Sequence, residues 1–448
     1  MSERDTPLPL SYRADLLQQV MPTLRAGECC SLVGASGVGK SNLAHFLQRR
    51  DVQSEYWGDE QTWVVAIDTN GLILDEQPDE YIVAELMIYR LIREAERRNL
   101  PADLVDDLDK KYIHLVERPS AHLALRYLER VCGRICETSG FRIVFVFDQF
   151  EDLWKTRGAR LFLNMRHLRD EFKYRLVYLV MTRERLPRSR SDLPAVESFW
   201  ELFTSHVYGL GMYSESDANM MIDRMAQRRG VGVPDELRQT ILSASGRHPG
   251  LLRAVFWALQ DAPSAAAGYD KLLQIDTIAR ECAKIWNDLL PEEQYIVRLA
   301  AGLQELSLDD PTLDDLQLKQ FVAGNPPTLF SPLFAAYALG QAGVDMSGIV
   351  VAPRLRQVWL DGQPLAKELS PLEFNLLEYL ARHAGEVCHR EDILRELYKE
   401  QMYNTNDERL DTLLRRLRET LGEDARNPRY LITHRGVGLR LANGRIQE

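Results

Sequence analysis

Short apolar runs alternate with longer amphipathic stretches over the first half of the chain. The five apolar runs are 29–34, 63–70, 142–148, 176–183 and 206–212. The central runs are apolar on both faces, as in strands of a parallel sheet that helices cover on both sides. Stretches 79–98 and 121–136 have the apolar spacing of helices that connect such strands. The pattern predicts an α/β fold with a parallel sheet.

After the fifth run the strand pattern gives way to short amphipathic helices, which continue to about Leu339. The first of them opens at Ser214, and Asp217 follows at the spacing of a capping box. Loose sequence with Gly and Pro between 322 and 348 then precedes a new β-rich run that begins at Ile349. We therefore predict a helical second region and a domain boundary near residue 347.

The last hundred residues have their own pattern, which is strand-like at first, then helical three times, and ends in a hairpin at 429–441. The first helix opens at Ser370, and the next two cover about 390–398 and 408–421. One face of the third helix carries leucines, at Leu410, Leu413, Leu414, Leu417 and Leu421. Its opposite face is polar and carries Glu408, Thr412, Arg415, Arg416 and Glu419. The third helix is therefore predicted to pack on one side and to expose arginines on the other.

A glycine-rich motif joins the first strand to the helix that follows. Residues 34–41 read GASGVGKS and match the phosphate-binding pattern GxxxxGK[ST] in its expected strand–loop–helix context. The glycines let backbone N–H groups surround phosphate oxygens, Lys40 reaches the β- and γ-phosphates, and the Ser41 hydroxyl binds Mg²⁺. The residues expected to hold the nucleotide are Gly34, Ser36, Gly37, Val38, Gly39, Lys40, Ser41 and Asn42. The expected ligand is a nucleoside triphosphate.

An acidic segment follows the buried strand at 142–148 and supplies the second half of such a site. Asp148 ends the strand and is expected to hold Mg²⁺ through water. Glu151 is the candidate for polarising the attacking water, with Gln149 and Asp152 as weaker alternatives.

The segment DQFEDL at 148–153 resembles the Walker B segment of the STAND ATPases, regulatory switches related to AAA+ proteins. Thr182-Arg183 closes the next strand where that family carries a sensor arginine, and GRHPGLL at 246–252 resembles its GxP motif. The resemblance implies that Arg183 contacts the γ-phosphate and that Pro249 packs near the adenine. Many AAA+ enzymes have Glu where this chain has Gln149, which implies slow turnover that depends on Glu151.

Residues 275–345 resemble the small winged-helix module that follows the ATPase core in STAND proteins. The module contains an acidic stretch, formed by Asp309, Asp310, Asp314 and Asp315. These carboxylates would repel DNA phosphates, so we interpret the module as a structural hinge. The module contains no histidine, so the nucleotide-sensing His of some relatives is missing.

The C-terminal strings LSPLEFNLLEYL, RLDTLLRRLRETLG and YLITHRGVGLRL are similar to the OmpR/PhoB-type winged-helix DNA-binding domain over its full length. The resemblance implies that helix 408–421 enters the major groove with Arg416 as base reader and Arg409 and Arg415 at phosphates. Thr412 shares this face, and Arg435 on the wing is assigned to the adjacent minor groove. Leu413 departs from the polar residue that many relatives have at its position.

Composition and charge narrow the class of protein. With 448 residues, 45% apolar and 27% charged, the chain is long and apolar enough for several cores, which excludes disordered and collagen-like classes. Residues 349–448 hold 16 Lys and Arg and 16 Asp and Glu, so the net charge of −11 resides in the first 348 residues. No apolar run is long enough for a membrane span or a signal core, so we expect a cytoplasmic protein without membrane contact. The six cysteines form no CxxC pair and are expected to be buried thiols.

Together these features predict four domains, a P-loop NTPase domain at 1–213, a helical lid at 214–274, a winged-helix-like hinge at 275–346 and a DNA-binding domain at 347–448. The predicted function is a nucleotide-switched transcriptional regulator in which ATP or ADP, with Mg²⁺, controls homo-oligomerisation and binding to double-stranded DNA. An activating protein or ligand is a further expected partner. The alternative is an AAA+-like DNA-remodelling or initiator ATPase that works in replication, transposition or defence. It would use the winged helix only for docking to DNA. A regulator that has lost nucleotide binding is disfavoured because the loop at 34–41 is intact.

Overall fold

The computed structural model describes most of the chain, in the ranges 7–58, 61–72, 77–98, 102–138, 140–190, 192–261, 268–302, 311–341, 348–353, 356–361, 363–365, 367, 369–398, 407–434 and 436–446. The chain divides into two compact units, 1–342 and 343–448, and each is described by itself. The finer division of the first unit at 213 and 274 stays a prediction.

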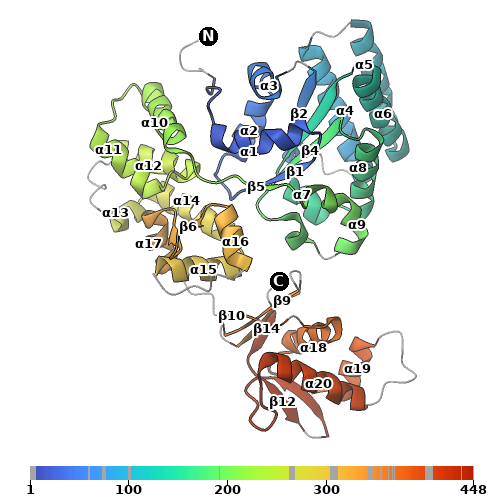
Figure 1. The fold of residues 1–448 in the computed structure, drawn as a ribbon, viewed down its shortest axis with the longest axis vertical. Helices are drawn as coiled ribbons and strands as arrows, with labels where there is room; N and C mark the ends of the chain where they lie inside the picture. The colour runs from blue at the N-terminus through green and yellow to red at the C-terminus, as the bar shows by residue number, and fades with distance from the viewer. Residues whose placement is uncertain are drawn as a thin grey trace. The chain divides into compact units, whose positions relative to one another are not determined.

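A five-stranded parallel sheet lies at the centre of the first unit, in the strand order β2-β3-β4-β1-β5 (Figure 1). The strands are β1 Cys30–Val33, β2 Thr62–Asp68, β3 Arg142–Asp148, β4 Leu176–Thr182 and β5 Val207–Gly209. Every residue of β1 and β4 is buried, and β3 is buried from its second residue onward, which explains why their sequences are apolar on both faces. The predicted α/β fold with a parallel sheet is confirmed.

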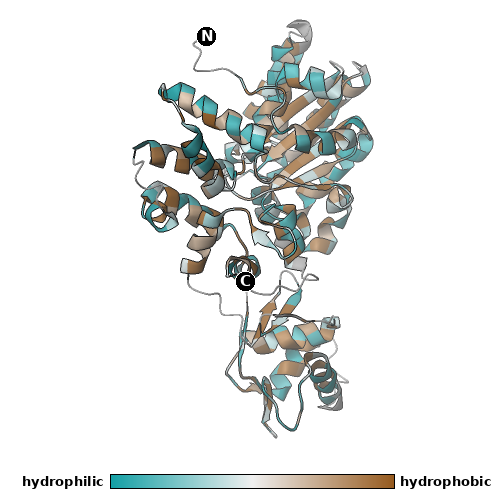
Figure 2. Ribbon diagram, turned by 60° about the vertical axis from the view of Figure 1, so that its left-hand side comes forward, coloured by the Kyte–Doolittle hydropathy of each residue, from teal (hydrophilic) through white to brown (hydrophobic). Residues whose placement is uncertain are grey.

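Helices cover both faces of this sheet (Figure 1). They are α1 Ala14–Arg25, α2 Lys40–Leu47, α3 Arg50–Trp57, α4 Asp79–Arg97, α5 Ala102–Glu117, α6 Ala121–Gly133, α7 Phe150–Thr156, α8 Ala159–Glu171 and α9 Leu193–Trp200. Figure 2 shows the strands as the apolar centre of the unit, with polar residues toward the outside of the helices. Phe147, Phe150, Trp154 and Phe199 form a buried aromatic group beside α7, and this packing fixes the start of that helix at the end of β3.

The remainder of the first unit is largely helical. Its elements are α10 Glu215–Arg229, α11 Asp235–Ser245, α12 Pro249–Asp261, α13 Tyr269–Leu273, α14 Asp276–Asn287, α15 Pro291–Ala301, α16 Pro311–Leu318, β6 Val322–Ala323, β7 Thr328–Leu329 and α17 Pro332–Gly340. The Ser214 side chain accepts a hydrogen bond from the Asp217 N–H at 3.1 Å, which caps α10 as the spacing predicts. These helices share one hydrophobic core with the sheet.

The second unit combines a small sheet, three helices and a hairpin. Its strands are β8 Ile349–Ala352, β9 Gln357–Leu360, β10 Gln363–Pro364, β11 Cys388–His389, β12 Leu431–His434, β13 Gly438–Leu441 and β14 Gly444–Ile446. Its helices are α18 Pro371–Arg382, α19 Arg390–Leu397 and α20 Asp407–Leu421. Sheet, three helices and a β12–β13 hairpin follow in the predicted winged-helix order. Beyond that prediction, β14 returns to pair in parallel with β8.

Candidate nucleotide site and candidate DNA-binding face

The loop between β1 and α2 turns on two glycines that have positive φ angles, Gly37 at 81° and Gly39 at 95°. Residues with a Cβ rarely adopt this conformation, so glycine is required at both positions. Gly39 is the N-cap of α2, which places the loop at the positive end of that helix. Ser41 and Asn42 lie in the first turn of α2 with exposed side chains, whereas Val38 is buried.

Lys40 is almost fully buried within this loop. Its Nζ donates hydrogen bonds to the carbonyl oxygens of Gly34 at 2.6 Å and Ala35 at 3.1 Å. Burial lowers the pKa of Lys40 to about 8, against the opposing effect of the nearby Glu151 and Asp288 carboxylates. The loop therefore holds an ammonium group in the place where the motif requires one for phosphate.

Two carboxylates lie at the carboxyl end of β3, that of Asp148, the last residue of the strand, and that of Glu151 three residues later. The turn between them is fixed by Gln149, which has a φ of 56°, and by Thr69, whose hydroxyl donates to the carbonyl oxygens of Asp148 and Gln149. Asp148 Oδ1 and Glu151 Oε2 are buried and accept no hydrogen bond from any residue that the structure describes. Buried carboxylate oxygens without donors suit a divalent cation and its water, so these residues fit Mg²⁺.

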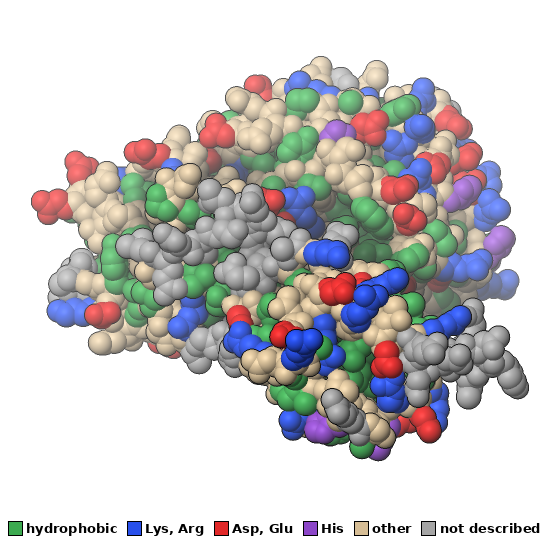
Figure 3. Space-filling model, turned by 60° about the horizontal axis from the view of Figure 1, so that its bottom comes forward, with side chains coloured by type: hydrophobic (Ala, Val, Ile, Leu, Met, Phe, Trp, Pro, Cys, Tyr) green, Lys and Arg blue, Asp and Glu red, His purple; other side chains and the backbone are tan. Residues whose placement is uncertain are grey.

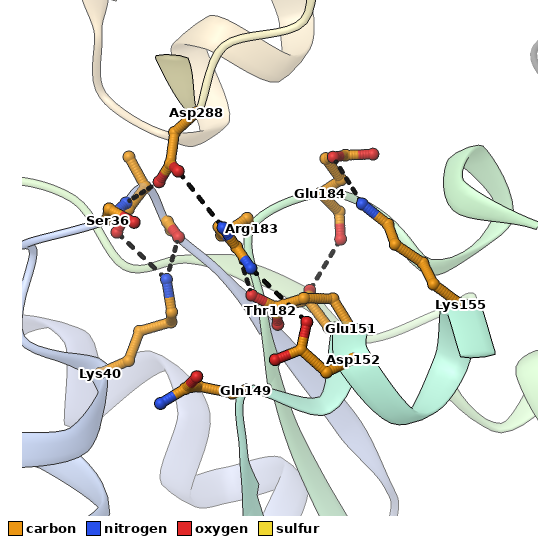
Figure 4. A network of polar contacts seen from close by, with 12 residues as sticks. Ser36, Lys40, Gln149, Glu151, Asp152, Lys155, Thr182, Arg183, Glu184 and Asp288 are labelled. Atoms are coloured by element: carbon orange, nitrogen blue, oxygen red, sulfur yellow. Dashed lines mark hydrogen bonds and ion pairs between the residues drawn. The ribbon is translucent and has the colours of Figure 1, made fainter. Parts of the chain in front are cut away.

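Arg183, at the end of β4, connects the second carboxylate to a residue from another part of the chain. Its guanidinium donates to Glu151 at 2.5 Å and to Asp288 at 3.3 Å, and lies 3.7 Å from Asp152 (Figure 4). Asp288 directly follows α14, and its other oxygen accepts a hydrogen bond from the Ser36 N–H at 2.7 Å. The fold thus brings the predicted residues Ser36, Glu151 and Arg183 together, and Asp288 joins them without having been predicted.

The segment before α12, predicted to resemble the GxP motif, contacts the same loop. The Gly250 N–H donates to the Gly37 carbonyl at 3.1 Å. His248 Nδ1 accepts from the Leu251 N–H at 3.2 Å, so Nε2 carries the proton and donates to the Ser36 carbonyl at 3.1 Å. Burial lowers the pKa of His248 to about 3, which keeps the ring neutral. Pro249 begins α12 between these two contacts, and its role near adenine stays a prediction.

Arg13 is a second residue of this region that the sequence did not single out. Its guanidinium donates to the carbonyl oxygens of Val38 at 2.7 Å, Gly211 at 2.9 Å and Met212 at 2.6 Å, and lies 4.4 Å from the centre of the Tyr213 ring. One side chain therefore ties the phosphate loop to the segment that follows β5. An arginine ahead of an ordinary amphipathic helix gives no local signal for such a role.

Helix α20 separates its two faces as predicted. The five leucines of its apolar face are buried in the core of the second unit, whereas Arg409, Thr412, Arg415 and Arg416 have exposed side chains. Leu413 is only 7% exposed and belongs to that core. Over the surface that Figure 3 draws, Lys and Arg side chains are interspersed with acidic ones. Arg435, the predicted wing contact, lies outside the described residues, as do Asp309 and Asp310.

Arg418 has a structural role on the same helix. Its guanidinium donates to the Leu431 carbonyl at 2.6 Å and to the Thr433 hydroxyl at 2.8 Å. It therefore anchors α20 to the first strand of the hairpin.

Among the described residues, no helix is both long enough and apolar enough to cross a bilayer. All six cysteines are buried thiols without a disulfide.

Three solved structures resemble parts of the chain. The Walker-type ATPase PABY2304 of Pyrococcus abyssi is 13% identical, covers 73% of this chain and 95% of its own, and has a TM-score of 0.46. The ORC2 protein of Aeropyrum pernix, solved as ADPNP–ADP complexes, is 14% identical over 75% of this chain and 96% of its own, with a TM-score of 0.43. The RstA DNA-binding domain of Klebsiella pneumoniae, solved with the RstA box, is 36% identical over 19% of this chain and 83% of its own, with a TM-score of 0.18.

Two family models match the chain. Residues 362–441 match the model described as transcriptional regulatory protein, C terminal, and residues 12–306 match the model described as Novel STAND NTPase 1. The longer match covers more than half of the chain, including the phosphate loop, the acidic segment after β3 and Arg183. The chain belongs to the Novel STAND NTPase 1 family and carries at its C-terminal end a DNA-binding domain of the transcriptional-regulator type.

Proposed function

We propose that the chain is a nucleotide-switched transcriptional regulator, in which ATP or ADP at the phosphate loop controls self-assembly and DNA binding. The observation that supports this most is the set of contacts on the loop itself. His248 and Asp288 both bond to Ser36, and they come from the helical elements after the sheet. Because these groups share the loop with the nucleotide phosphates, binding of nucleotide changes how the helical elements are held.

Each residue of the nucleotide site has a distinct role in this proposal. Lys40 and the loop amides bind the phosphates, Ser41 and Asp148 hold Mg²⁺, and Arg183 contacts the γ-phosphate. Mg²⁺ held by these residues would neutralise phosphate charge. Glu151 accepts a proton from the attacking water. Its carboxylate is already paired with Arg183, so water activation requires rearrangement of that pair, which agrees with a slow ATPase.

DNA binding is assigned to the second unit. The proposal places α20 in the major groove with Arg416 at a base edge, Arg409 and Arg415 at phosphates, Thr412 on the same face and Arg435 at the minor groove. The acidic first 348 residues oppose nonspecific DNA association. Tight binding then requires several winged helices on repeated half-sites, which nucleotide-dependent assembly supplies.

Sedimentation velocity of the full chain with ADP and with a non-hydrolysable ATP analogue tests the switch. The proposal expects a larger species with the analogue and a smaller one with ADP, and it expects Lys40→Ala to remain small with both. Equal sedimentation in the two nucleotides contradicts the proposal. ATP turnover measured with and without duplex DNA distinguishes the switch from the alternative, an AAA+-like ATPase that remodels DNA. Such an ATPase is stimulated by DNA, whereas a switch is not.

A further inference from the structure

Asp288 bridges two donors of the nucleotide site. One carboxylate oxygen accepts from the Ser36 N–H at 2.7 Å and the other from the Arg183 guanidinium at 3.3 Å (Figure 4). The side chain is only 11% exposed. A carboxylate that joins a loop amide to a guanidinium offers these donors the same negative, oxygen-based acceptors as a phosphate group.

We assign these two donors to the outer end of the phosphate site, where a terminal phosphate would lie. Ser36 lies three residues before Gly39, the N-cap of α2, so its N–H is separate from the helix N-terminal amides that bind the inner phosphates. Arg183 is the side chain that we assign to the γ-phosphate. Asp288 therefore competes with the terminal phosphate of a triphosphate, whereas a diphosphate does not need its donors.

A second carboxylate, on α14 itself, supports this inference. Glu281 lies two turns before Asp288, and its Oε1 is buried and has no hydrogen-bond partner among the described residues. A Cβ added to Gly37 would lie 2.7 Å from this oxygen, and one added to Gly250 would lie 1.9 Å from it. Helix α14 and the residue that directly follows it thus place two carboxylates against the phosphate loop, and both repel the additional charge of a γ-phosphate.

We propose that Asp288 is a specificity-determining residue of the nucleotide site, which selects a nucleoside diphosphate over a triphosphate while α14 contacts the loop. A triphosphate binds only when α14 moves away and releases Ser36 and Arg183. This inference rests on the proposed function. It supplies a lock for the resting state that does not need a histidine in the 275–346 module.

The test is isothermal titration of the full chain, without DNA, with Mg-ADP and with the Mg-bound ATP analogue. Asp288→Asn keeps the shape of the side chain but removes its charge, so the affinity ratio is expected to shift toward the analogue by about 5- to 150-fold, the usual range of coupling between linked states. Asp288→Ala is the second variant and is expected to shift the ratio in the same direction. Thermal unfolding of both variants checks that they fold.

Two control variants distinguish the effect of the Asp288 carboxylate on the affinity ratio from the effect of a general loosening of the helices. Asp276→Asn makes the same charge change on α14, at an exposed residue paired with Arg280, and is expected to leave the ratio unchanged. Asp315→Asn removes another contact to the sheet region, the 2.6 Å pair with Arg185, and is expected to affect both nucleotides alike. The inference is overturned if both Asp288 variants keep the wild-type ratio, or if Asp315→Asn shifts it equally. A shifted ratio in a protein whose DNA binding ignores nucleotide contradicts the proposed function and leaves this inference standing.

Discussion

His248 Nε2 donates a hydrogen bond to the carbonyl oxygen of Ser36 at 3.1 Å, so a neutral imidazole joins the turn before α12 to the phosphate loop. The ring is fully buried, and burial lowers its pKa to about 3. The folded protein therefore binds fewer protons here than the unfolded chain between pH 6.5 and 3.

The first prediction concerns acid stability. The free energy of unfolding is expected to fall as pH drops below about 6.5, with His248 contributing up to about 1.4 kcal/mol per pH unit, because protonation favours the unfolded chain. His248→Asn is expected to flatten this slope, and His122→Asn, at an exposed position, is expected to keep it. Denaturant unfolding at pH 5, 6 and 7 measures the effect. Equal slopes in all three proteins would show that His248 is not the group responsible.

The second prediction concerns the phosphate loop. Lys40→Ala is expected to weaken ATP binding by about 100-fold or more, since the loop loses its charged donor and such hydrogen bonds contribute about 1.5–3 kcal/mol each. Isothermal titration measures the affinity, with Lys173→Ala as a control at an exposed lysine. Near-wild-type ATP affinity in Lys40→Ala would contradict the assignment of the nucleotide site to this loop.

The third prediction follows from the pKa of Lys40, which burial lowers to about 8. Phosphate binds the protonated amine, so ATP affinity is expected to decline as pH rises above about 8. The stability of the protein without nucleotide is expected to rise from about pH 8 to 10.5, because the unfolded chain then binds more protons. Lys40→Met is expected to abolish this rise in stability. Isothermal titration with ATP and denaturant unfolding of the nucleotide-free protein, both across pH 7 to 10, test these two opposite trends. ATP affinity and stability that change in the same direction would contradict the assignment of the lowered pKa to Lys40.

The fourth prediction separates binding from hydrolysis. Glu151→Gln is expected to preserve ATP binding and to lower turnover by about 10²- to 10⁴-fold, because an amide cannot accept a proton from water. Asp152→Asn, at the more exposed neighbour, is the matched control and is expected to have a smaller effect. Phosphate release in single-turnover experiments measures both. Unchanged turnover in Glu151→Gln would move the catalytic role to another residue.

The fifth prediction concerns the DNA-binding face. Residues 349–448 are expected to fold alone and bind duplex DNA, because they have a core of their own. Arg416→Ala is expected to weaken DNA binding by about 1–3 kcal/mol at one base position. Arg409→Ala is expected to weaken binding to all sequences alike and to lower the slope of log affinity against log salt concentration by about one. Arg418→Ala is expected to lower domain stability, since Arg418 anchors the hairpin. Fluorescence anisotropy with a set of single-base variants distinguishes these outcomes, and identical base profiles for wild type and Arg416→Ala would exclude base reading.

The sequence predicted the elements whose residues are buried on regular faces. Strand β3 occupies the predicted 142–148, and the leucine face of α20 is the core of its unit. Strand β5 is shorter than its predicted run and half-buried, so its pattern is weaker. The three residues of β14 contain two that carry little strand signal, Gly444 and Arg445, and their pairing with β8 is a tertiary effect.

The candidate site was predicted where its residues form a local motif, as in the phosphate loop and the segment after β3. Asp288 could not be found in this way, because Ser36 lies 252 positions away in the sequence and a helix-ending aspartate is ordinary. Arg13 was missed for the same reason, since its partners Val38 and Gly211 are distant along the chain. Contacts that join the helical elements to the loop depend on the fold and have no local pattern.

Footprinting of the full-length protein on its DNA target, with ADP and with the ATP analogue, tests the central claim most directly. The account predicts protection of several adjacent half-sites with the analogue and little protection with ADP, and it predicts that Lys40→Ala gives the ADP pattern with both nucleotides. A single half-site protected equally in the two nucleotide states would contradict the account and indicate a constitutive DNA-binding protein.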